Sequence, residues 1–330
     1  DELQEIVCGA PNVEQGQKVI VAMPGARLPG GMEIGEREMH GYPSNGMICS
    51  LQELGFPEKV VPKQYAEGIY VLPDDIIVGE DAKPVLGLDD TIYDFDLTPN
   101  RSDALSMRGV GHEVGAILSQ VPEFEAVNLR ESKEHDFDDM MTLSVANPQD
   151  APVYSLRIIE DLEVKESPMW LQRKLMASGM RPIDNLVDVT NYIMMEYGQP
   201  LHAFDKDLIT TDEICVRRAE EGETLVTLDG RERQLGAEDI VITDGEQPIA
   251  LGGVMGGENT HISDATKSVA LEAAVFNPLH IRRTAGRLNL RSEASSRFEK
   301  GINLSVVTQA LNHKTLDRKS GSAGMPRPIS

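Results

Sequence analysis

Glycine and proline residues interrupt the first 88 residues of the chain so often that only short strands fit between them. Apolar runs such as Lys18–Ala22 stop at turn residues, which include Pro24–Gly25 and Pro29–Gly31. Short apolar runs bounded by such residues are typical of an all-β domain with tight connections. The sequence therefore predicts a small barrel or sandwich from Ile6 to about Leu88.

Helical patterns begin after this region. The segment Thr98–Asp103 supplies a proline and capping side chains, and apolar residues follow at a spacing of three and four, which predicts a helix over 103–119. Two further apolar stripes start at a proline and end at a glycine, a pattern that favours helices over 168–178 and 182–197.

Strand patterns alternate with these helices in the second half of the chain. The dipeptide Asp229–Gly230 lies between Thr224–Leu228 and Arg231–Leu235, which is the strongest short hairpin signal in the sequence. Two more strands are expected, over 239–243 and 268–276. No period of 20–50 residues is visible, so a repeat protein is not expected.

An acidic segment separates the two patterns. Residues 123–139 hold seven acidic side chains and two basic ones, as expected of a solvated linker, although their alternation leaves room for an edge strand. We therefore predict an α+β fold with several domains. The expected parts are an all-β domain over 1–90, a helical segment and acidic linker over 91–145, a mixed α/β domain over 146–318 and a tail without structure over 319–330.

The net charge of −23 excludes a uniformly basic surface, so any contact with nucleic acid must be local. No apolar run approaches the roughly 18 residues of a membrane span, and Asp1–Glu5 is too acidic for a signal peptide. Three scattered cysteines, Cys8, Cys49 and Cys215, favour a reducing compartment, with the cytoplasm as the expected location. The missing initiator methionine indicates an internal piece of a longer protein.

Common catalytic motifs are absent from the sequence. It contains no phosphate-binding Gly-x-x-x-x-Gly-Lys-Ser/Thr loop, no His-Glu-x-x-His zinc motif, no Gly-x-Ser-x-Gly elbow and no dinucleotide fingerprint. The seven histidines are never spaced as metal ligands. The sequence therefore argues against these nucleotide-binding, zinc-hydrolase and serine-hydrolase classes and predicts no metal site.

One acidic residue breaks the pattern of a predicted strand. Glu272 lies inside Val269–Val275, a run that is apolar on both faces, so its carboxylate is expected in the protein interior, where an unpaired charge is costly. Two interpretations are open. Glu272 forms a structural pair with an arginine or with backbone amides, or it receives the hydroxyl group of a ligand in a small pocket.

Two other features could complete such a pocket. The paired glycines at 252–253 and 256–257 let a backbone approach a ligand, with their N–H groups facing a developing negative charge, or they form a tight turn. His202 follows Gln199–Pro200–Leu201 near a helix end, and it is either a packing histidine or part of the site.

A local cluster of positive charge contrasts with the acidic chain. Between His280 and Gly301 there are six basic side chains and two acidic ones. The candidates for contact with phosphate groups are Arg282, Arg283, Arg287 and Arg291. A charge-balanced, exposed helix face is the alternative interpretation.

These stretches together resemble one family, the β chain of bacterial phenylalanyl-tRNA synthetase. The segments that look like the family's tRNA-binding OB barrel are Ile6–Val13, Leu28–Gly31 and Ser44–Ser50. Thr98–Asp103 matches the segment that follows the barrel. The segments that look like the family's B3/B4 module are Arg181–Tyr192, Gln199–Asp205 and Ser292–Gly301. The resemblance spans about residues 6–312 and uses many separate motifs.

The resemblance implies a role within a larger enzyme. The family's whole enzyme is an α2β2 assembly that attaches phenylalanine to its tRNA with ATP and magnesium, and the α chain performs that step. The B3/B4 module instead hydrolyses tyrosine that is wrongly esterified to the same tRNA. The resemblance also implies that the chain starts inside the OB barrel and stops before the modules that contact magnesium, so no cofactor is expected in this piece.

The family's editing pocket falls on His202, Gly256, Glu272, Ser292 and Ala294. In the mechanism that this implies, water attacks the ester, His202 helps to hold the ester or the water, and backbone N–H groups near Gly256 face the oxyanion. Ser292 and Ala294 shape the end that receives the side chain. Many relatives carry threonine where this chain has Ser292, and serine keeps the hydroxyl group.

Three functions are left open at this point. The first is an editing hydrolase joined to a tRNA-binding domain within a synthetase subunit, in which Glu272 selects the extra hydroxyl group of tyrosine. The second is a non-catalytic, tRNA-binding fragment that is inert without the α chain. The third is a free-standing aminoacyl-tRNA deacylase.

Overall fold

The computed structural model describes residues 3–124 and 136–317 and divides the chain into two compact units. The first unit comprises Asp1–Asp94 and Glu166–Asp184, and the second comprises Phe95–Lys165 and Asn185–Ser330. Each unit therefore combines two separate stretches of sequence. The predicted tail and most of the predicted acidic linker lie outside the described residues.

Short paired strands form the framework of the first unit. The antiparallel pairs are β1 (Lys18–Val19) with β6 (Val71–Leu72), β2 (Val21–Ala22) with β5 (Met47–Ile48), and β3 (Glu36–Met39) with β4 (Tyr42–Asn45). Two short helical turns, η1 (Glu58–Val60) and η2 (Lys63–Tyr65), lie between β5 and β6, and the short helix α1 (Ala82–Leu86) follows β6. The predicted short strands are therefore present, whereas their closure into an OB-type barrel stays a prediction.

Helix α4 (Met169–Ala177) completes the core of the first unit, although it is distant from the strands in the sequence. Met176 packs in the same buried cluster as Leu51 and Tyr70. The Arg173 guanidinium donates a hydrogen bond of 2.6 Å to the carbonyl oxygen of Pro84 in α1. The helix predicted over 168–178 is confirmed, and its packing places it with the amino-terminal strands.

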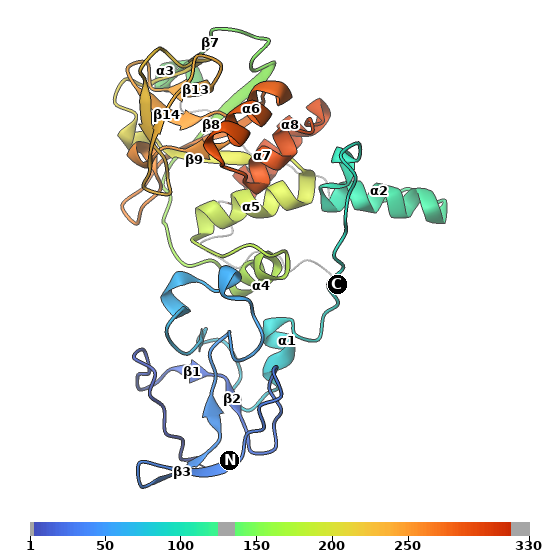
Figure 1. Ribbon diagram of the computed structural model, residues 1–330, viewed down its shortest axis with the longest axis vertical. Helices are drawn as coiled ribbons and strands as arrows, with labels where there is room; N and C mark the ends of the chain where they lie inside the picture. Colours follow the sequence, from blue (N-terminus) through green and yellow to red (C-terminus); the bar gives the residue numbers. More distant parts are fainter. Residues whose placement is uncertain (1–2, 125–135, 318–330) are drawn as a thin grey trace. The chain divides into compact units, whose positions relative to one another are not determined.

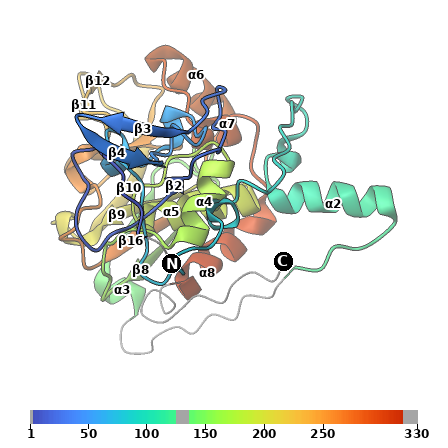
Figure 2. The same cartoon turned by 90° about the horizontal axis from the view of Figure 1, so that it is seen from below.

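Two larger sheets form the second unit. One has five strands in the order β15-β14-β13-β10-β7. The other has three strands in the order β8-β16-β9, which are labelled in Figure 2. The strand bounds are Thr142–Val145 (β7), Val153–Ile159 (β8), Leu201–Asp205 (β9), Glu213–Arg218 (β10), Ile240–Thr243 (β13), Pro248–Leu251 (β14), Met255–Gly256 (β15) and Val269–Val275 (β16). Strands β7 and β10 are parallel, and the other neighbours are antiparallel.

The predicted hairpin is confirmed as β11 (Thr224–Val226) and β12 (Glu232–Gln234), which pair in antiparallel register. Its turn is closed by a hydrogen bond of 2.8 Å from the Gly230 N–H group to the Thr227 carbonyl oxygen. Gly230 has a φ of 72°, which is the left-handed conformation that glycine adopts without a steric penalty. The local Asp-Gly signal was therefore sufficient to place this element.

Helices also belong to the second unit. Their bounds are Ser102–Ala104 (η3), Met107–Leu118 (α2), Phe137–Met140 (α3), Asn185–Tyr197 (α5), Lys206–Leu208 (η4), Glu258–Thr260 (η5), Pro278–Leu288 (α6), Glu293–Phe298 (α7), Leu304–Val306 (η6) and Val307–Asp317 (α8). Helices α5, α7 and α8 lie beside the sheets of this unit, whereas α2 contacts α5 and projects away from the sheets (Figure 1). No helix in the described ranges is long and apolar enough to cross a membrane.

Two predicted helices begin later than expected. The helix predicted over 103–119 begins at Met107, because the Ser106 side chain caps it by accepting a hydrogen bond from the Gly109 N–H group. The helix predicted over 182–197 begins at Asn185, whose N–H group donates to the Lys165 carbonyl oxygen at 2.9 Å. In both cases a specific hydrogen bond sets the first residue, which the apolar spacing alone did not determine.

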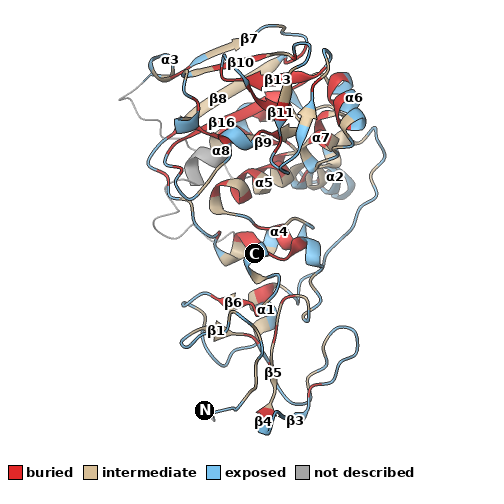
Figure 3. Ribbon diagram, turned by 60° about the vertical axis from the view of Figure 1, so that its left-hand side comes forward, coloured by how far each residue is buried: buried red, intermediate tan, exposed pale blue. Residues whose placement is uncertain are grey.

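Strand β16 forms the centre of the second unit, and all seven of its residues are buried (Figure 3). Side chains alternate between the two faces of a strand. Leu271 and Ala273 pack on one face in a cluster with residues of α5 and α8. Ala270 and Ala274 pack on the other face, in the large core between the two sheets. This second face also carries Glu272.

Candidate active site

Strand β16 carries Glu272 into the core between the two sheets. The residue is 5% exposed, so its predicted burial is confirmed. Its neighbours on the same face, Ala270 and Ala274, have small side chains and are fully buried. A carboxylate in this position requires a hydrogen-bond donor, because an unpaired buried charge is costly.

The donor is a phenol. Tyr154 of β8 lies opposite Ala274 in the strand register, which makes it a diagonal neighbour of Glu272. Its hydroxyl group donates a hydrogen bond of 2.7 Å to Glu272 Oε2. This pairing differs from the arginine or backbone amides that the structural interpretation of the sequence offered.

Burial and the hydrogen bond have opposite effects on the Glu272 carboxyl group. Burial disfavours the charged form and raises the pKa of Glu272 to about 7, while the hydrogen bond from Tyr154 lowers it. Burial and the neighbouring carboxylate raise the pKa of Tyr154 well above its ordinary value. Tyr154 therefore stays protonated near neutral pH and acts as the donor of this pair.

His202 lies beside Glu272 on the neighbouring strand. The register of β9 and β16 places the two residues directly opposite each other, and their side chains point to the same face of the sheet. The imidazole packs edge-on against the ring of Phe204, with 4.5 Å between the ring centroids. Cross-strand pairing therefore brings together two titratable side chains that are 70 residues apart in the sequence.

The glycine-rich segment passes close to the imidazole. A Cβ atom at Gly256 would lie 2.5 Å from His202 Cε1, so a larger residue at this position would displace the ring. The Gly257 N–H group donates to the Ile249 carbonyl oxygen at 2.8 Å, which makes Gly256 and Ala250 a non-hydrogen-bonded pair. The N–H group of Gly256 consequently points away from β14.

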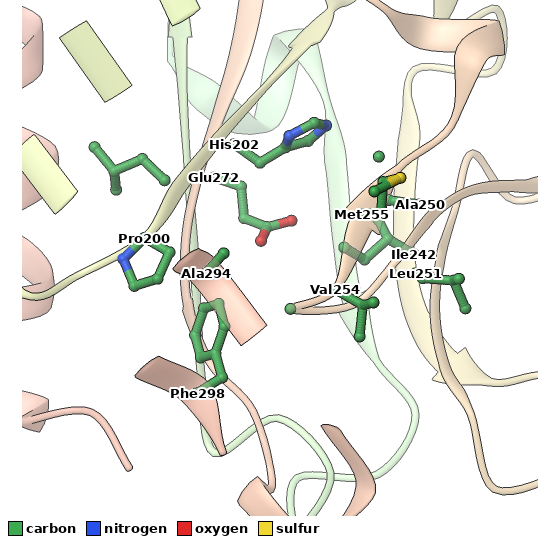
Figure 4. A pocket seen from close by; sticks show the side chains of 13 residues that line it. Pro200, His202, Ile242, Ala250, Leu251, Val254, Met255, Glu272, Ala294 and Phe298 are labelled. Atoms are coloured by element: carbon green, nitrogen blue, oxygen red, sulfur yellow. The ribbon is translucent and has the colours of Figure 1, made fainter. Parts of the chain in front are cut away.

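These residues line one pocket (Figure 4). Its lining consists of Pro200, Leu201, His202, Ile242, Ala250, Leu251, Gly253, Val254, Met255, Gly256, Glu272, Ala294 and Phe298. Figure 4 shows the Glu272 carboxylate pointing into the space between Ile242 and the helix that carries Ala294 and Phe298. A pocket lined by apolar side chains, one buried carboxylate and one imidazole suits an apolar or aromatic group that carries a hydroxyl.

Four of the five residues predicted for the pocket line it, and Ser292 does not. Ser292 is the N-cap of α7, where its hydroxyl oxygen accepts from the Ser295 N–H group at 3.1 Å. The same hydroxyl donates to the carbonyl oxygen of Val254 at 3.2 Å. Ser292 therefore connects the start of α7 to the glycine-rich segment and contributes to the pocket through its neighbours.

The four predicted phosphate-binding arginines lie on α6 and just after it, and all are exposed. Arg287 forms an ion pair with the buried Asp239 and donates to the Gln234 carbonyl oxygen. Within residues 3–124 and 136–317, no ion pair involves Arg282, Arg283 or Arg291. Three of the four side chains are therefore available to a ligand, and Arg287 is partly neutralised.

Sequence reasoning missed the importance of Tyr154 and of Phe298. Alternation over Tyr154, Leu156 and Ile158 could have placed these three side chains on one face of a strand. It could not have shown that the strand pairs with β16, and therefore that the phenol reaches Glu272. Among the described residues, no group of three or more His, Cys, Asp or Glu side chains is arranged to hold a metal ion.

The sequence matches the family model described as "B3/4 domain" over residues 150–315, which is half of the chain. The chain belongs to this family. The matched region contains both the Glu272–Tyr154 pair and every residue that lines the pocket.

Three relatives with similar sequences are each called phenylalanine–tRNA ligase beta subunit. The proteins from Streptococcus agalactiae and Listeria monocytogenes are 53% identical over 94% of this chain, and that from Latilactobacillus sakei is 54% identical over 94%. The chain covers 38–39% of the length of these relatives. The resemblance to the β chain of phenylalanyl-tRNA synthetase, an aminoacyl-tRNA synthetase subunit, is thereby confirmed.

A solved structure was also found to be similar. It is an N-terminal fragment of the phenylalanyl-tRNA synthetase β-subunit from Pyrococcus horikoshii, which covers 64% of this chain at 15% identity. The match extends over 67% of that fragment. The TM-score is 0.33, which is too low for this similarity to support a functional assignment.

Proposed function

We propose that this chain is the editing part of a phenylalanine–tRNA ligase β subunit, and that the pocket at Glu272 hydrolyses tyrosine esterified to tRNA(Phe). The observation that carries the proposal is a buried carboxylate in a pocket whose other lining side chains, apart from His202, are apolar; this carboxylate accepts a hydrogen bond from one phenol and lies opposite His202. The similarity to ligase β subunits supports the choice of substrate.

Glu272 provides the selectivity in this proposal. A hydrophobic pocket alone discriminates poorly between phenylalanine and the nearly isosteric tyrosine. A hydrogen bond from a substrate phenol to a charged acceptor is worth about 1.5–3 kcal/mol. Phenylalanine cannot form this bond, so the tyrosyl ester is favoured by roughly tenfold to a few hundredfold.

His202 and the backbone near Gly256 act on the ester. The attacking group is water, since the aminoacyl ester is already reactive. His202 holds the water or the ester carbonyl at a fixed position, and such positioning of reactants lowers the activation barrier. The Gly256 N–H group, which does not bond to β14, stabilises the developing oxyanion. The small side chain of Ala294 on α7 leaves space in the pocket for the substrate side chain.

In this proposal the chain acts within a whole ligase. In this proposal the β subunit assembles with an α chain as α2β2 in the cytoplasm, and the α chain attaches phenylalanine with ATP and Mg²⁺. The described residues offer no ligand cluster for a metal ion. In this proposal the chain binds tRNA, and it positions and hydrolyses the wrong ester.

Deacylation of preformed Tyr-tRNA(Phe) by the purified chain tests the proposal. Glu272→Ala and His202→Ala are each expected to slow hydrolysis at least tenfold, with the Glu272 variant also losing its preference for tyrosyl over phenylalanyl ester. Glu232→Ala and His261→Ala are the matched controls, because both residues are exposed and lie outside the pocket. Unchanged hydrolysis by both pocket variants would rule out the assignment.

A second candidate is a tRNA-binding fragment that is inert by itself. The chain spans 39% of its relatives' length, and this candidate assigns the hydrolysis to the assembled ligase. Comparison of the chain with the assembled α2β2 ligase separates the two candidates. Hydrolysis by the assembly alone, with the chain inactive, would support this second function.

We also propose that residues 1–90 form an OB-type tRNA-binding domain and that α6 contacts tRNA phosphate groups. Replacing Arg282 and Arg283 with alanine should weaken tRNA binding and reduce the slope of log affinity against log salt by about one unit per contact. Arg287→Ala serves as the comparison, since its ion pair with Asp239 predicts a smaller effect. Equal effects of all three substitutions would contradict this picture.

A further inference from the structure

The hydrogen bond between Tyr154 and Glu272 has no role in the reaction outlined above, although it holds a carboxylate that lines the pocket. We propose that Tyr154 is a positioning residue for selectivity: its hydroxyl group holds Oε2 of Glu272, so that Oε1 is left to accept the hydroxyl group of a bound tyrosyl ester. This inference rests on the proposed editing function.

The geometry supports different roles for the two carboxylate oxygens of Glu272. A carboxylate offers about four acceptor sites on its two oxygens, so it can receive two phenols at once. Among the residues that the structure describes, Tyr154 alone donates to Glu272, and it uses Oε2. The Glu272 side chain nevertheless faces the pocket, where Oε1 can receive a second donor.

Aromatic packing fixes the position of the Tyr154 ring. Tyr154 contacts Phe276 edge-to-face, with 6.2 Å between ring centroids. Phe276 in turn contacts Phe298 at 5.2 Å, and Phe298 lines the pocket. The orientation of the carboxylate is therefore coupled to the wall that contacts the substrate ring. A phenylalanine at position 154 would keep this packing and remove the hydroxyl group alone.

Electrostatics gives the inference a measurable consequence. The titratable side chains that face Glu272 are Tyr154 from β8 and His202 from β9, and α7 contributes apolar Ala294 and Phe298. The hydrogen bond from Tyr154 stabilises the charged form of Glu272 against desolvation. Its removal raises the pKa of Glu272, so that a smaller fraction of the carboxyl group is ionised near neutral pH.

The test compares the pH profile of Tyr-tRNA(Phe) deacylation in wild type and in Tyr154→Phe, after subtraction of uncatalysed hydrolysis. One hydrogen bond to a charged acceptor corresponds to an upward shift of roughly one pH unit in the acidic limb of kcat/KM. From a wild-type midpoint at about 7, this gives roughly a fivefold loss at about pH 7 that is recovered at about pH 9.

Tyr70→Phe is the matched control, because Tyr70 is also buried and donates its hydroxyl group outside the pocket, to Gln172. The pH profile of kcat/KM for Glu272→Gln should show no acidic limb from position 272, because the glutamine side chain does not titrate. A loss in Tyr154→Phe that is equal at all pH values would assign Tyr154 a structural role and overturn the inference. Faster hydrolysis of the tyrosyl ester would also overturn it, because Tyr154 would then be competing with the substrate.

A second measurement separates this inference from the proposed function. The carboxyl carbon of Glu272, followed by NMR with ¹³C-labelled glutamate, reports its pKa without any enzymatic activity. An upward shift in Tyr154→Phe together with absent deacylation would support the positioning of Glu272 and reject the editing function. Active deacylation with an unshifted Glu272 would support editing and reject the role of Tyr154.

Discussion

Replacing Gly256 with alanine perturbs the pocket through a single methyl group. The new Cβ atom would lie 2.5 Å from Cε1 and 2.8 Å from Nε2 of His202. Because carbon atoms pack at about 3.5 Å or more, the imidazole must move by about 1 Å. The backbone at Gly256 is outside the left-handed region, so the perturbation comes from this contact and not from backbone strain.

The expected consequences differ for catalysis and for stability. A displacement of about 1 Å at a positioning group lowers the rate of ester hydrolysis about 100-fold. Overpacking lowers the free energy of unfolding by about 1–3 kcal/mol. Initial rates of Tyr-tRNA(Phe) deacylation and urea unfolding measure the two effects. Gly286→Ala on α6 is the control, since no atom lies within 4 Å of its new Cβ and its rate should not change.

A double variant tests whether Gly256→Ala lowers the rate of hydrolysis by displacing His202. Residues in contact show non-additive changes, so Gly256→Ala combined with His202→Ala should be no slower than His202→Ala alone. The double variant should also recover stability relative to Gly256→Ala, because the ring that the methyl group contacts is absent. Full activity of Gly256→Ala, or losses that multiply in the double variant, would refute this reasoning.

Two further predictions concern stability and pH. The pKa of Glu272 is raised from 4.5 to about 7, so the stability that its protonated form contributes is lost as the pH rises through this interval. The free energy of urea unfolding of Glu272→Gln, relative to that of wild type, should therefore rise by about 3 kcal/mol from about pH 4 to about pH 8. The same difference between variant and wild type at both pH values would contradict this prediction. The Arg218 guanidinium holds the pKa of the buried Asp150 carboxyl group below its ordinary value of 3.8. Asp150→Asn should lower the free energy of unfolding by about 1–2 kcal/mol at about pH 7, and this difference should shrink below about pH 3; a constant difference would argue against the pair.

Short-range signals in the sequence predicted individual elements well. The Asp229–Gly230 dipeptide located a hairpin because the turn depends on those two residues and their neighbours. Glu272 was recognised as buried because its six neighbours in β16 are apolar. Such features depend on residues adjacent in the chain, which a linear pattern reports directly. The first residues of α2 and α5 were missed because side-chain and tertiary hydrogen bonds set them.

The partners of Glu272 were decided by tertiary structure. Tyr154 is 118 residues away in the sequence and reaches Glu272 because β8 pairs with β16 in one particular register. A shift of that register by one residue would turn the phenol to the other face of the sheet. The sequence determined that a carboxylate is buried; the pairing of distant strands decided which side chains surround it, because register is a property of the assembled sheet.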